Sequence, residues 1–114
     1  MMVRDSVIKN VEWRGKIAVV KAEGEIDLNT SSVFQQDLLK VSDESPQRIV
    51  IDLSDVDYMD SSGIASLVKL LSHSRKEGFG MVLVSPQKRV QSVLEITRLS
   101  TIFDIRDSVD EAME

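Results

Sequence analysis

The chain changes from strand to helix within residues 57–66, Asp57-Tyr58-Met59-Asp60-Ser61-Ser62-Gly63-Ile64-Ala65-Ser66. This stretch follows the most apolar strand candidate and opens the longest helical pattern of the chain. Asp and Ser are favoured at helix N-termini because their side-chain oxygens accept hydrogen bonds from the unpaired amides of the first turn. The simplest interpretation is a capped helix start, with Ser61 as the expected cap.

Gly63 is unexpected inside a first helical turn, where Gly costs about 1 kcal/mol relative to Ala. The surrounding residues are also small, and the exposed start of the helix would therefore carry almost no bulky side chain. The small residues are Ser61, Ser62, Gly63, Ala65 and Ser66. A bare helix N-terminus lets another protein or a phosphate approach the backbone closely. The stretch therefore predicts a contact surface as well as a helix start.

Two buried strands flank this helix. Residues 48–53 form a nearly continuous apolar run, as expected for a strand that is covered on both faces. The helix then extends from Ser62 to about Lys76 and ends at Gly78-Phe79-Gly80, before a second buried strand at residues 81–84. Its predicted inner face follows the three-and-four spacing of an amphipathic helix and consists of Ile64, Leu67, Val68 and Leu71.

The amino-terminal part predicts a hairpin followed by a helix. Residues 7–13 and 17–22 are strand candidates, joined by a tight turn at residues 14–16. Gly24-Glu25-Ile26-Asp27 is expected to end their pairing. Asn29 or Thr30 then caps a helix that reaches about Val41, before a loop at residues 43–46. Its apolar stripe consists of Val33, Phe34, Leu38 and Val41.

The carboxyl-terminal part continues the alternation of helix and strand. Ser85-Pro86 starts a helix with Val90, Val93 and Leu94 on its apolar side, flanked by Ile96, and residues 102–105 form a short strand. Ser108 caps a last turn at residues 109–113. Such alternation implies mainly parallel strands with right-handed crossovers. The sequence therefore predicts one α/β domain over residues 1–114, with a mixed, mainly parallel sheet, an N-terminal hairpin and about four helices.

Composition excludes several classes of protein. The 114 residues include 42% hydrophobic residues, enough for a core, and no cysteine for disulfides or zinc–thiolate sites. A net charge of −5 with 4% aromatic residues argues against a nucleic-acid partner. No apolar run approaches the roughly 20 residues that span a bilayer, and residues 1–6 lack the apolar centre of a signal peptide. We therefore expect a soluble, cytoplasmic protein with no membrane partner.

The sequence does not favour catalysis. His73, the only histidine, lies about 18 Å along the same helix from Ser61 at ~1.5 Å rise per residue, too far to act as its base. The chain contains neither a G-x-S-x-G elbow nor a G-x-x-x-x-G-K-[ST] loop. No catalytic residue and no cofactor is therefore predicted, and the chain is expected not to be an enzyme.

A series of acidic residues raises the alternative of a metal or phosphoaspartate site. The series is Asp52, Asp55, Asp57 and Asp60. It lacks the glycine and the closing glutamate of a calcium loop, and no acidic pair follows the first strand to hold magnesium. These carboxylates are interpreted as solvated turn residues, and no metal site is predicted.

The remaining chemical feature is a partly exposed serine at a helix N-terminus among carboxylates. A phosphate at this place gains from the helix dipole. It also adds about −1.5 to −2 charges to a surface that is already acidic. The residues therefore suit a switch in which a phosphate changes recognition more than it changes the fold.

Three features resemble the bacterial anti-anti-sigma factors, or anti-sigma factor antagonists, of the STAS domain family. Gly24-Glu25-Ile26-Asp27 is similar to the family's G-E-[LI]-D after the second strand. Ile49-Val50-Ile51-Asp52-Leu53-Ser54 leads through Tyr58-Met59 into Asp60-Ser61-Ser62-Gly63, which matches the family's phosphorylation motif. The order of the predicted elements also agrees along essentially the whole chain. At Ile64-Ala65, relatives commonly carry Leu-Gly.

The resemblance implies a phosphorylation switch at Ser61. A partner serine kinase with a GHKL-type ATP site, which is also the anti-sigma factor, would phosphorylate Ser61, and a metal-dependent PP2C-type phosphatase would reverse the reaction. The unphosphorylated protein would bind the kinase and free the sigma factor. ATP and magnesium would belong to these partners. Asp27 would lie beside the phosphorylation site, and Asp60 would flank it.

The expected partner surface covers the Ser61 end and the outer face of the same helix. Ser62, Ser66 and Lys69 follow one another there at three-to-four spacing. The predicted partner-binding set is Asp27, Asp60, Ser61, Ser62, Gly63, Ser66 and Lys69. One alternative from another class stays open, namely a STAS-domain scaffold or subunit of a signalling or transport complex in which Ser61 is a cap only.

Overall fold

The computed structural model describes residues 6–114, and the prediction about the amino terminus falls mainly on residues 1–5, outside the described residues. The elements follow one another as β1 (Ile8–Arg14), β2 (Ile17–Ile26), α1 (Ser31–Ser42), β3 (Arg48–Met59), α2 (Ser61–Glu77), β4 (Gly80–Val84), α3 (Lys88–Ile96), the 3₁₀ turn η1 (Leu99–Thr101), β5 (Asp104–Arg106) and α4 (Val109–Ala112). This order confirms the predicted alternation and the α/β fold class.

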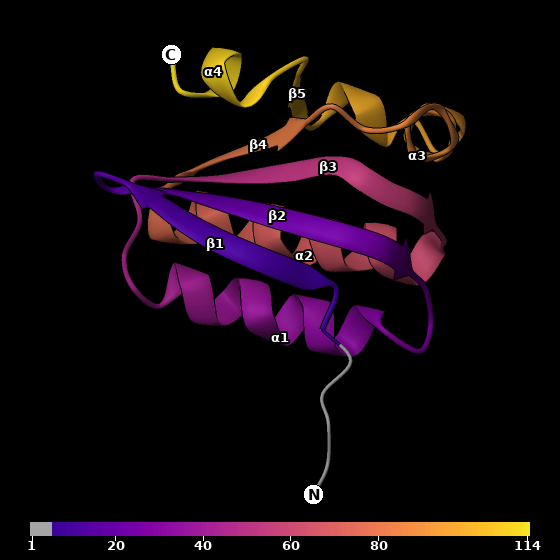
Figure 1. Ribbon diagram of the computed structural model, residues 1–114, viewed down its shortest axis with the longest axis horizontal. Coiled ribbons are helices and arrows are strands. Elements are labelled where there is room, and N and C mark those ends of the chain that lie inside the picture. The colour runs from indigo at the N-terminus through magenta and orange to yellow at the C-terminus, as the bar shows by residue number, and fades with distance from the viewer. Residues whose placement is uncertain (1–5) are drawn as a thin grey trace, which may run out of the picture.

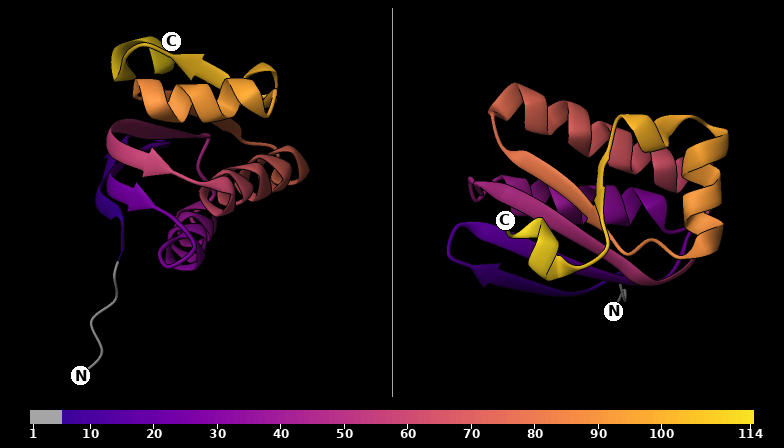
Figure 2. Two further views of the ribbon diagram at one scale, coloured as in Figure 1. Left: turned by 90° about the vertical axis from the view of Figure 1, so that its right-hand side faces the viewer. Right: turned by 90° about the horizontal axis from the view of Figure 1, so that it is seen from above.

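The five strands form one sheet in the order β1-β2-β3-β4-β5. β1 and β2 form the antiparallel hairpin, whereas β2, β3, β4 and β5 are parallel to one another. Helices α1 and α2 run side by side under one face of the sheet, and α4 lies over the other face (Figures 1 and 2). Helix α3 lies at the end where the parallel strands finish (Figure 1). The predicted mixed, mainly parallel sheet is therefore confirmed.

Strand β3 is buried on both faces, as its apolar run predicts. Ile49 and Ile51 belong to the main core, which includes the inner faces of α1 and α2. Val50, between them, belongs to a smaller core with Val82 and Ala112. Because side chains alternate across a strand, one apolar run serves both layers.

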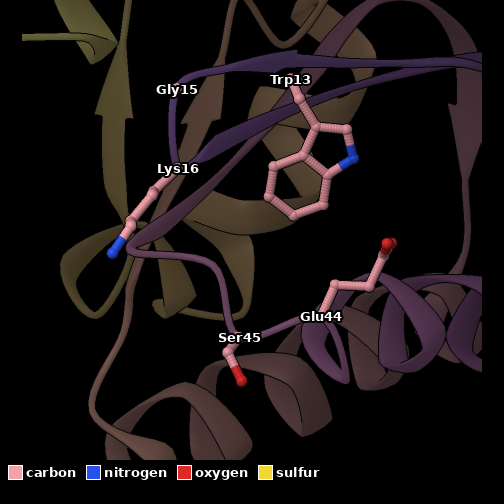
Figure 3. A pocket seen from close by; sticks show the side chains of 5 residues that line it. All are labelled: Trp13, Gly15, Lys16, Glu44 and Ser45. Atoms are coloured by element: carbon pink, nitrogen blue, oxygen red, sulfur yellow. The ribbon is translucent and has the colours of Figure 1, made fainter.

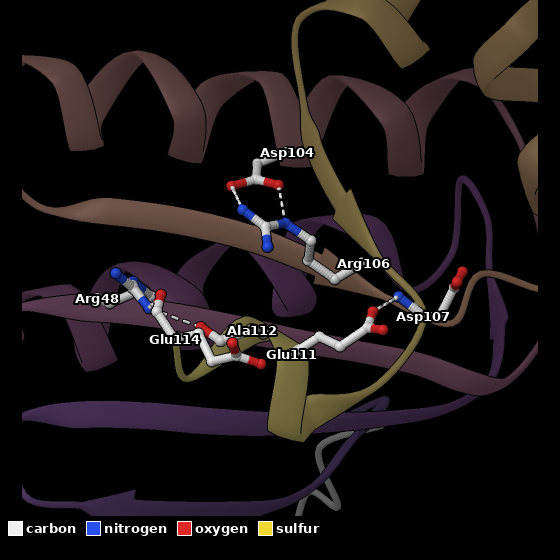
Figure 4. Close-up of polar contacts among 7 residues, drawn as sticks. All are labelled: Arg48, Asp104, Arg106, Asp107, Glu111, Ala112 and Glu114. Atoms are coloured by element: carbon white, nitrogen blue, oxygen red, sulfur yellow. Dashed lines mark hydrogen bonds and ion pairs between the residues drawn. The ribbon is translucent and has the colours of Figure 1, made fainter.

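Polar contacts hold the carboxyl-terminal residues against the face of the sheet that α4 covers (Figure 4). Arg48 Nη1 donates to the carbonyl oxygen of Ala112 at 2.6 Å and to that of Glu114 at 3.2 Å. Ser108 Oγ accepts from the Glu111 amide at 3.1 Å, which confirms the predicted cap of α4.

Strands β2 and β3 are longer than predicted. Gly24-Glu25-Ile26 ends the pairing with β1 but continues to pair with β3, so that Ile26 lies opposite Met59. Register shifts flank Gly24, which has a φ of 91° that glycine adopts readily. The interpretation of Asp52, Asp55 and Asp57 as turn residues is therefore wrong, because all three lie on β3. Asp55 and Asp57 are exposed, whereas Val56 between them is buried.

Helix α3 begins at Lys88, later than the predicted start at Ser85-Pro86. Ser85 has a left-handed φ of 51°, and its amide donates to the Arg106 carbonyl oxygen at 2.9 Å, so it ends the sheet instead of starting a helix. Ile96 is 81% exposed and does not support the predicted apolar side. The final strand likewise begins at Asp104 because Ile102 closes the 3₁₀ turn.

Candidate functional site

Two loops meet where the parallel strands β2 and β3 end. One loop follows Ile26, and the other is the junction between Met59 and α2. The Asp60 amide donates to the Ile26 carbonyl oxygen at 3.1 Å, and the Leu28 amide donates to Asp60 Oδ2 at 3.2 Å. Parallel pairing brings together residues that are more than 30 positions apart, and these two bonds hold the loops in contact.

Asp60, rather than the predicted Ser61, is the N-cap of α2. Its Oδ1 accepts from the Ser62 amide at 2.9 Å, from the Gly63 amide at 3.3 Å and from Ser62 Oγ at 2.5 Å. The Ser62 hydroxyl, together with the Gly63, Ser62 and Leu28 amides, lowers the pKa of the Asp60 carboxyl below its ordinary 3.8. A carboxylate can accept several bonds at once, and this explains why aspartate takes the cap position.

Ser61 is the first residue of α2 and is exposed. Its hydroxyl forms no hydrogen bond with any of residues 6–114, whereas the neighbouring Ser62 hydroxyl is engaged by Asp60. The two serines of the motif are therefore different in kind. Ser61 presents a free hydroxyl to solvent, and Ser62 helps to fix the cap.

Asp27 shapes the loop after β2. Its Oδ1 accepts from the Asn29 amide at 2.9 Å, and its carbonyl oxygen accepts from the Ser31 amide at 2.8 Å. Thr30 stands at the N-cap position of α1, but its hydroxyl accepts from the Asp27 amide at 3.0 Å instead of capping the helix. Asp27 is thus held within the loop that contacts Asp60 through Leu28.

Leu28 was not predicted as a site residue. Its side chain is 79% exposed although its amide is anchored on Asp60. The sequence signal that could have indicated it is an isolated leucine between Asp27 and Asn29, in a polar turn where no apolar stripe needs it.

Gly63 faces the core and not the exposed start of the helix, contrary to the sequence argument. A Cβ at this position would lie 2.6 Å from Met59 Cγ, 2.8 Å from Ile26 Cγ2 and 3.0 Å from the Ile26 carbonyl oxygen. The missing side chain lets α2 start directly against the ends of β2 and β3. Gly63 therefore serves packing.

Ser66 does not belong to the outer face of α2, and the predicted row of Ser62, Ser66 and Lys69 is wrong at this residue. Ser66 is 2% exposed, and its hydroxyl donates to the Ser31 carbonyl oxygen of α1 at 3.1 Å. The exposed face of α2 instead carries Ser61, Ala65, Lys69, Ser72, Arg75 and Lys76. Lys69, Ser72, His73 and Lys76 line a shallow cavity of about 200 Å3 on this face.

The acidic series has local partners. Asp52 Oδ1 accepts from the Ser54 amide at 3.0 Å, and Asp55 pairs with Lys21 at 3.2 Å. Within residues 6–114, no group of three or more His, Asp or Glu side chains is arranged to hold a metal ion. Among the same residues, no helix is both long and apolar enough to cross a bilayer.

Comparisons with known proteins agree on one family. The chain matches the STAS domain over residues 9–112. The anti-sigma-B factor antagonist of Bacillus subtilis strain 168 is 31% identical over 86 residues, which are 75% of this chain and 78% of that protein. The crystal structure of an anti-sigma factor antagonist from Mycobacterium paratuberculosis is 30% identical with a TM-score of 0.84, covering 91% of this chain and 88% of that one.

The fold likeness extends to more distant structures. The anti-sigma factor antagonist SpoIIAA in its unphosphorylated form has a TM-score of 0.79 at 17% identity, over 91% of each chain. At this identity the likeness concerns the fold alone, and it agrees with the five-stranded sheet and four helices of residues 6–114.

Proposed function

Because the chain belongs to the STAS domain family, we propose that it is an anti-sigma factor antagonist that is switched by phosphorylation of Ser61. In the unphosphorylated state it binds an anti-sigma factor and thereby frees a sigma factor. Phosphorylation ends this binding. The relatives that carry the name of anti-sigma factor antagonist support the first part of the proposal.

The observation that carries the switch is the free hydroxyl of Ser61. It is exposed at the start of α2, on a backbone that the Asp60 cap holds in place. Transfer of the ATP γ-phosphoryl group to Ser61 Oγ needs an accessible hydroxyl and breaks no hydrogen bond of the fold. The Ser62 hydroxyl would first have to leave Asp60. These contacts favour Ser61 over Ser62 as the acceptor.

The resemblance to the family implies the kinase and the phosphatase. The anti-sigma factor is proposed to be a serine kinase with a GHKL-type ATP site, and a PP2C-type phosphatase restores the serine. ATP and magnesium are substrates and cofactors of those enzymes. This chain supplies the acceptor hydroxyl, the position of the acceptor and the surface that the kinase recognises.

The proposed partner surface consists of the exposed face of α2 and the loop after β2. Ser61, Ala65 and Lys69 follow one another on α2 at a spacing of four residues, and all three are exposed. Leu28 adds an exposed apolar side chain on a loop that is tied to Asp60. Covering this exposed side chain with a partner would remove apolar surface from water, which favours binding.

Electrostatic repulsion at this surface accounts for release of the partner. The amides of Ser62 and Gly63 already bind Asp60, so a phosphate on Ser61 meets a satisfied helix start beside a carboxylate. A partner carboxylate about 6 Å from a doubly charged phosphate would be repelled by about 1.4 kcal/mol at the dielectric constant of water, and by about 5–6 kcal/mol at an effective value of 20. Each step of about 1.4 kcal/mol is tenfold in affinity.

Phosphorylation of the purified protein tests the proposal. The protein is incubated with magnesium, ATP and each candidate GHKL-type kinase of its own genome, and its intact mass is measured. We expect the mass of one added phosphate, lost in Ser61→Ala and largely retained in the matched control Ser62→Ala. A phosphate that peptide mapping places on Ser62 or Thr30 would contradict the assignment. Kinase binding without any labelling would favour a constitutive scaffold.

A further inference from the structure

A cavity of about 490 Å3 is lined in part by the turn of the β1–β2 hairpin. This turn lies at the opposite end of the molecule from the start of α2 (Figure 1). Trp13, Gly15 and Lys16 line the cavity from the hairpin, and Glu44 and Ser45 line it from the loop after α1 (Figure 3). We propose that this cavity binds a small organic ammonium ion between the face of the Trp13 indole and the Glu44 carboxylate.

The walls of the cavity are fixed by the backbone. The Gln47 amide donates to the Lys16 carbonyl oxygen at 2.8 Å, and the Gly80 amide donates to the Gln47 carbonyl oxygen at 3.0 Å. The Glu44 amide donates to the Val41 carbonyl oxygen at 3.1 Å, which ties Glu44 to the end of α1. The hairpin turn is therefore bonded to the residue that precedes β3, and the loop that carries Glu44 is bonded to the end of α1.

Both recognition groups are accessible to solvent. Trp13 is 38% exposed, and the carboxylate of Glu44 forms neither a hydrogen bond nor an ion pair with these residues. Lys16, the cation of the lining, points away from both groups (Figure 3). Arg14, which precedes Gly15 in the hairpin, forms ion pairs with Glu12 at 2.5 Å and with Asp110 at 3.8 Å and not with Glu44. No cation of the described part of the chain therefore pairs with the Glu44 carboxylate.

The chemistry of this lining selects a cation. The face of an indole ring attracts ammonium groups more strongly than that of any other side chain. A carboxylate adds a charge-assisted hydrogen bond to any ammonium that retains an N–H group. Helix α1 also ends here, with Asp43 as its C-cap, and the negative end of a helix dipole favours a cation and disfavours the carboxylates of Asp43 and Glu44. An anion would meet the Glu44 carboxylate and the negative end of α1, with Lys16 as the one cation of the lining.

Trp13 is the only tryptophan of the chain, so its fluorescence reports on this cavity alone. The full-length protein is titrated with n-butylammonium chloride and, separately, with tetramethylammonium chloride, at ionic strength held constant with sodium chloride. We expect a saturable change with a Kd on the order of millimolar for butylammonium, and weaker binding of tetramethylammonium, which cannot donate to Glu44. Amide NMR shifts of Gly15 and Ser45 provide a second measurement of the same titration.

Two charge-neutralising variants distinguish binding in this cavity from a general effect of ionic strength. Glu44→Gln is expected to weaken butylammonium binding about tenfold, the size of one charge-assisted contact. Glu95→Gln removes the same charge from exposed α3 and is expected to leave the Kd unchanged. Circular dichroism checks that both variants fold. A linear response that sodium chloride reproduces, or equal affinities of Glu44→Gln and the wild-type protein, would overturn the proposal.

Discussion

At the scale of single residues, three of the four residues in the Asp60-Ser61-Ser62-Gly63 motif have a structural role. Asp60 caps α2, Ser62 supports that cap, and Gly63 permits contact with the strand ends. Only Ser61 has no structural partner in the described chain. The sequence indicated a special position but not these roles, because capping by Asp60 and packing of Gly63 depend on where β2 ends.

Gly63→Ala is expected to destabilise the protein although alanine is the better helix former. The helix preference would favour alanine by about 1 kcal/mol. The new methyl group would instead overlap with Met59 and with the Ile26 backbone, and overpacking of this kind costs about 1–3 kcal/mol. Urea unfolding measures the net effect, with Ala65→Gly on the exposed face as the control for preference alone. A more stable Gly63→Ala variant would contradict the packing role.

Asp60 is expected to make part of the stability depend on pH. Because its folded-state pKa lies below the ordinary 3.8, the charged carboxylate stabilises the fold fully above that value and loses its effect as the pH falls through the folded-state pKa. Asp60→Asn keeps a capping oxygen but no charge. The difference in free energy of unfolding between the wild-type protein and Asp60→Asn should be constant near neutral pH and shrink below about pH 4. A difference that does not shrink as the pH falls below 3.8 would assign the effect to the geometry of the cap and not to its charge.

At the scale of elements, α2 joins the core to the proposed partner surface. Its inner stripe was predicted from the spacing of Ile64, Leu67, Val68 and Leu71; Val68 is half-buried against the core, and the other three are buried. The burial of Ser66 was not predictable from that spacing. A polar serine can be buried here because its hydroxyl donates to the Ser31 carbonyl oxygen of α1. Periodicity identifies apolar faces, whereas helix-to-helix contact is a tertiary property.

Ala65→Trp should therefore separate binding from stability. Ala65 is exposed one turn after Ser61, so a bulky side chain there obstructs the proposed partner surface with little effect on the core. We expect kinase binding to weaken at least about tenfold, with a Tm close to that of the wild-type protein.

Ser66→Trp is the matched variant on the buried side of the same helix. It should lower the Tm, because the indole cannot fit between α1 and α2. Titration calorimetry and thermal unfolding measure the two effects for both variants. Unchanged kinase affinity of Ala65→Trp would place the interface on another face.

At the scale of the whole molecule, the sheet topology assembles the site. Parallel strands end at the same edge, and the loops after β2 and β3 therefore meet although Asp27 and Asp60 are distant in sequence. The alternation of elements predicted this topology. It did not predict how far β2 and β3 extend, since the sequence alone favours a turn at Asp55 and Asp57, and the pairing of β2 with β3 is a tertiary property.

The acidic composition and the rigid cap together favour a switch that leaves the fold unchanged. The helix dipole stabilises a phosphate at an exposed N-terminus by about 0.3–1 kcal/mol. This gain is smaller than the repulsion expected at a partner interface, so the interface responds more strongly than the domain.

The most direct test of this account compares kinase binding of the wild-type protein and Ser61→Asp, with backbone NMR shifts recorded for both free proteins. We expect weaker binding of Ser61→Asp, with shift changes confined to the neighbourhood of Asp27 and the start of α2. Ser61→Asn is the neutral control and should bind more tightly than Ser61→Asp. Equal affinity of all three proteins, or shift changes spread through all five strands, would contradict an electrostatic switch at Ser61.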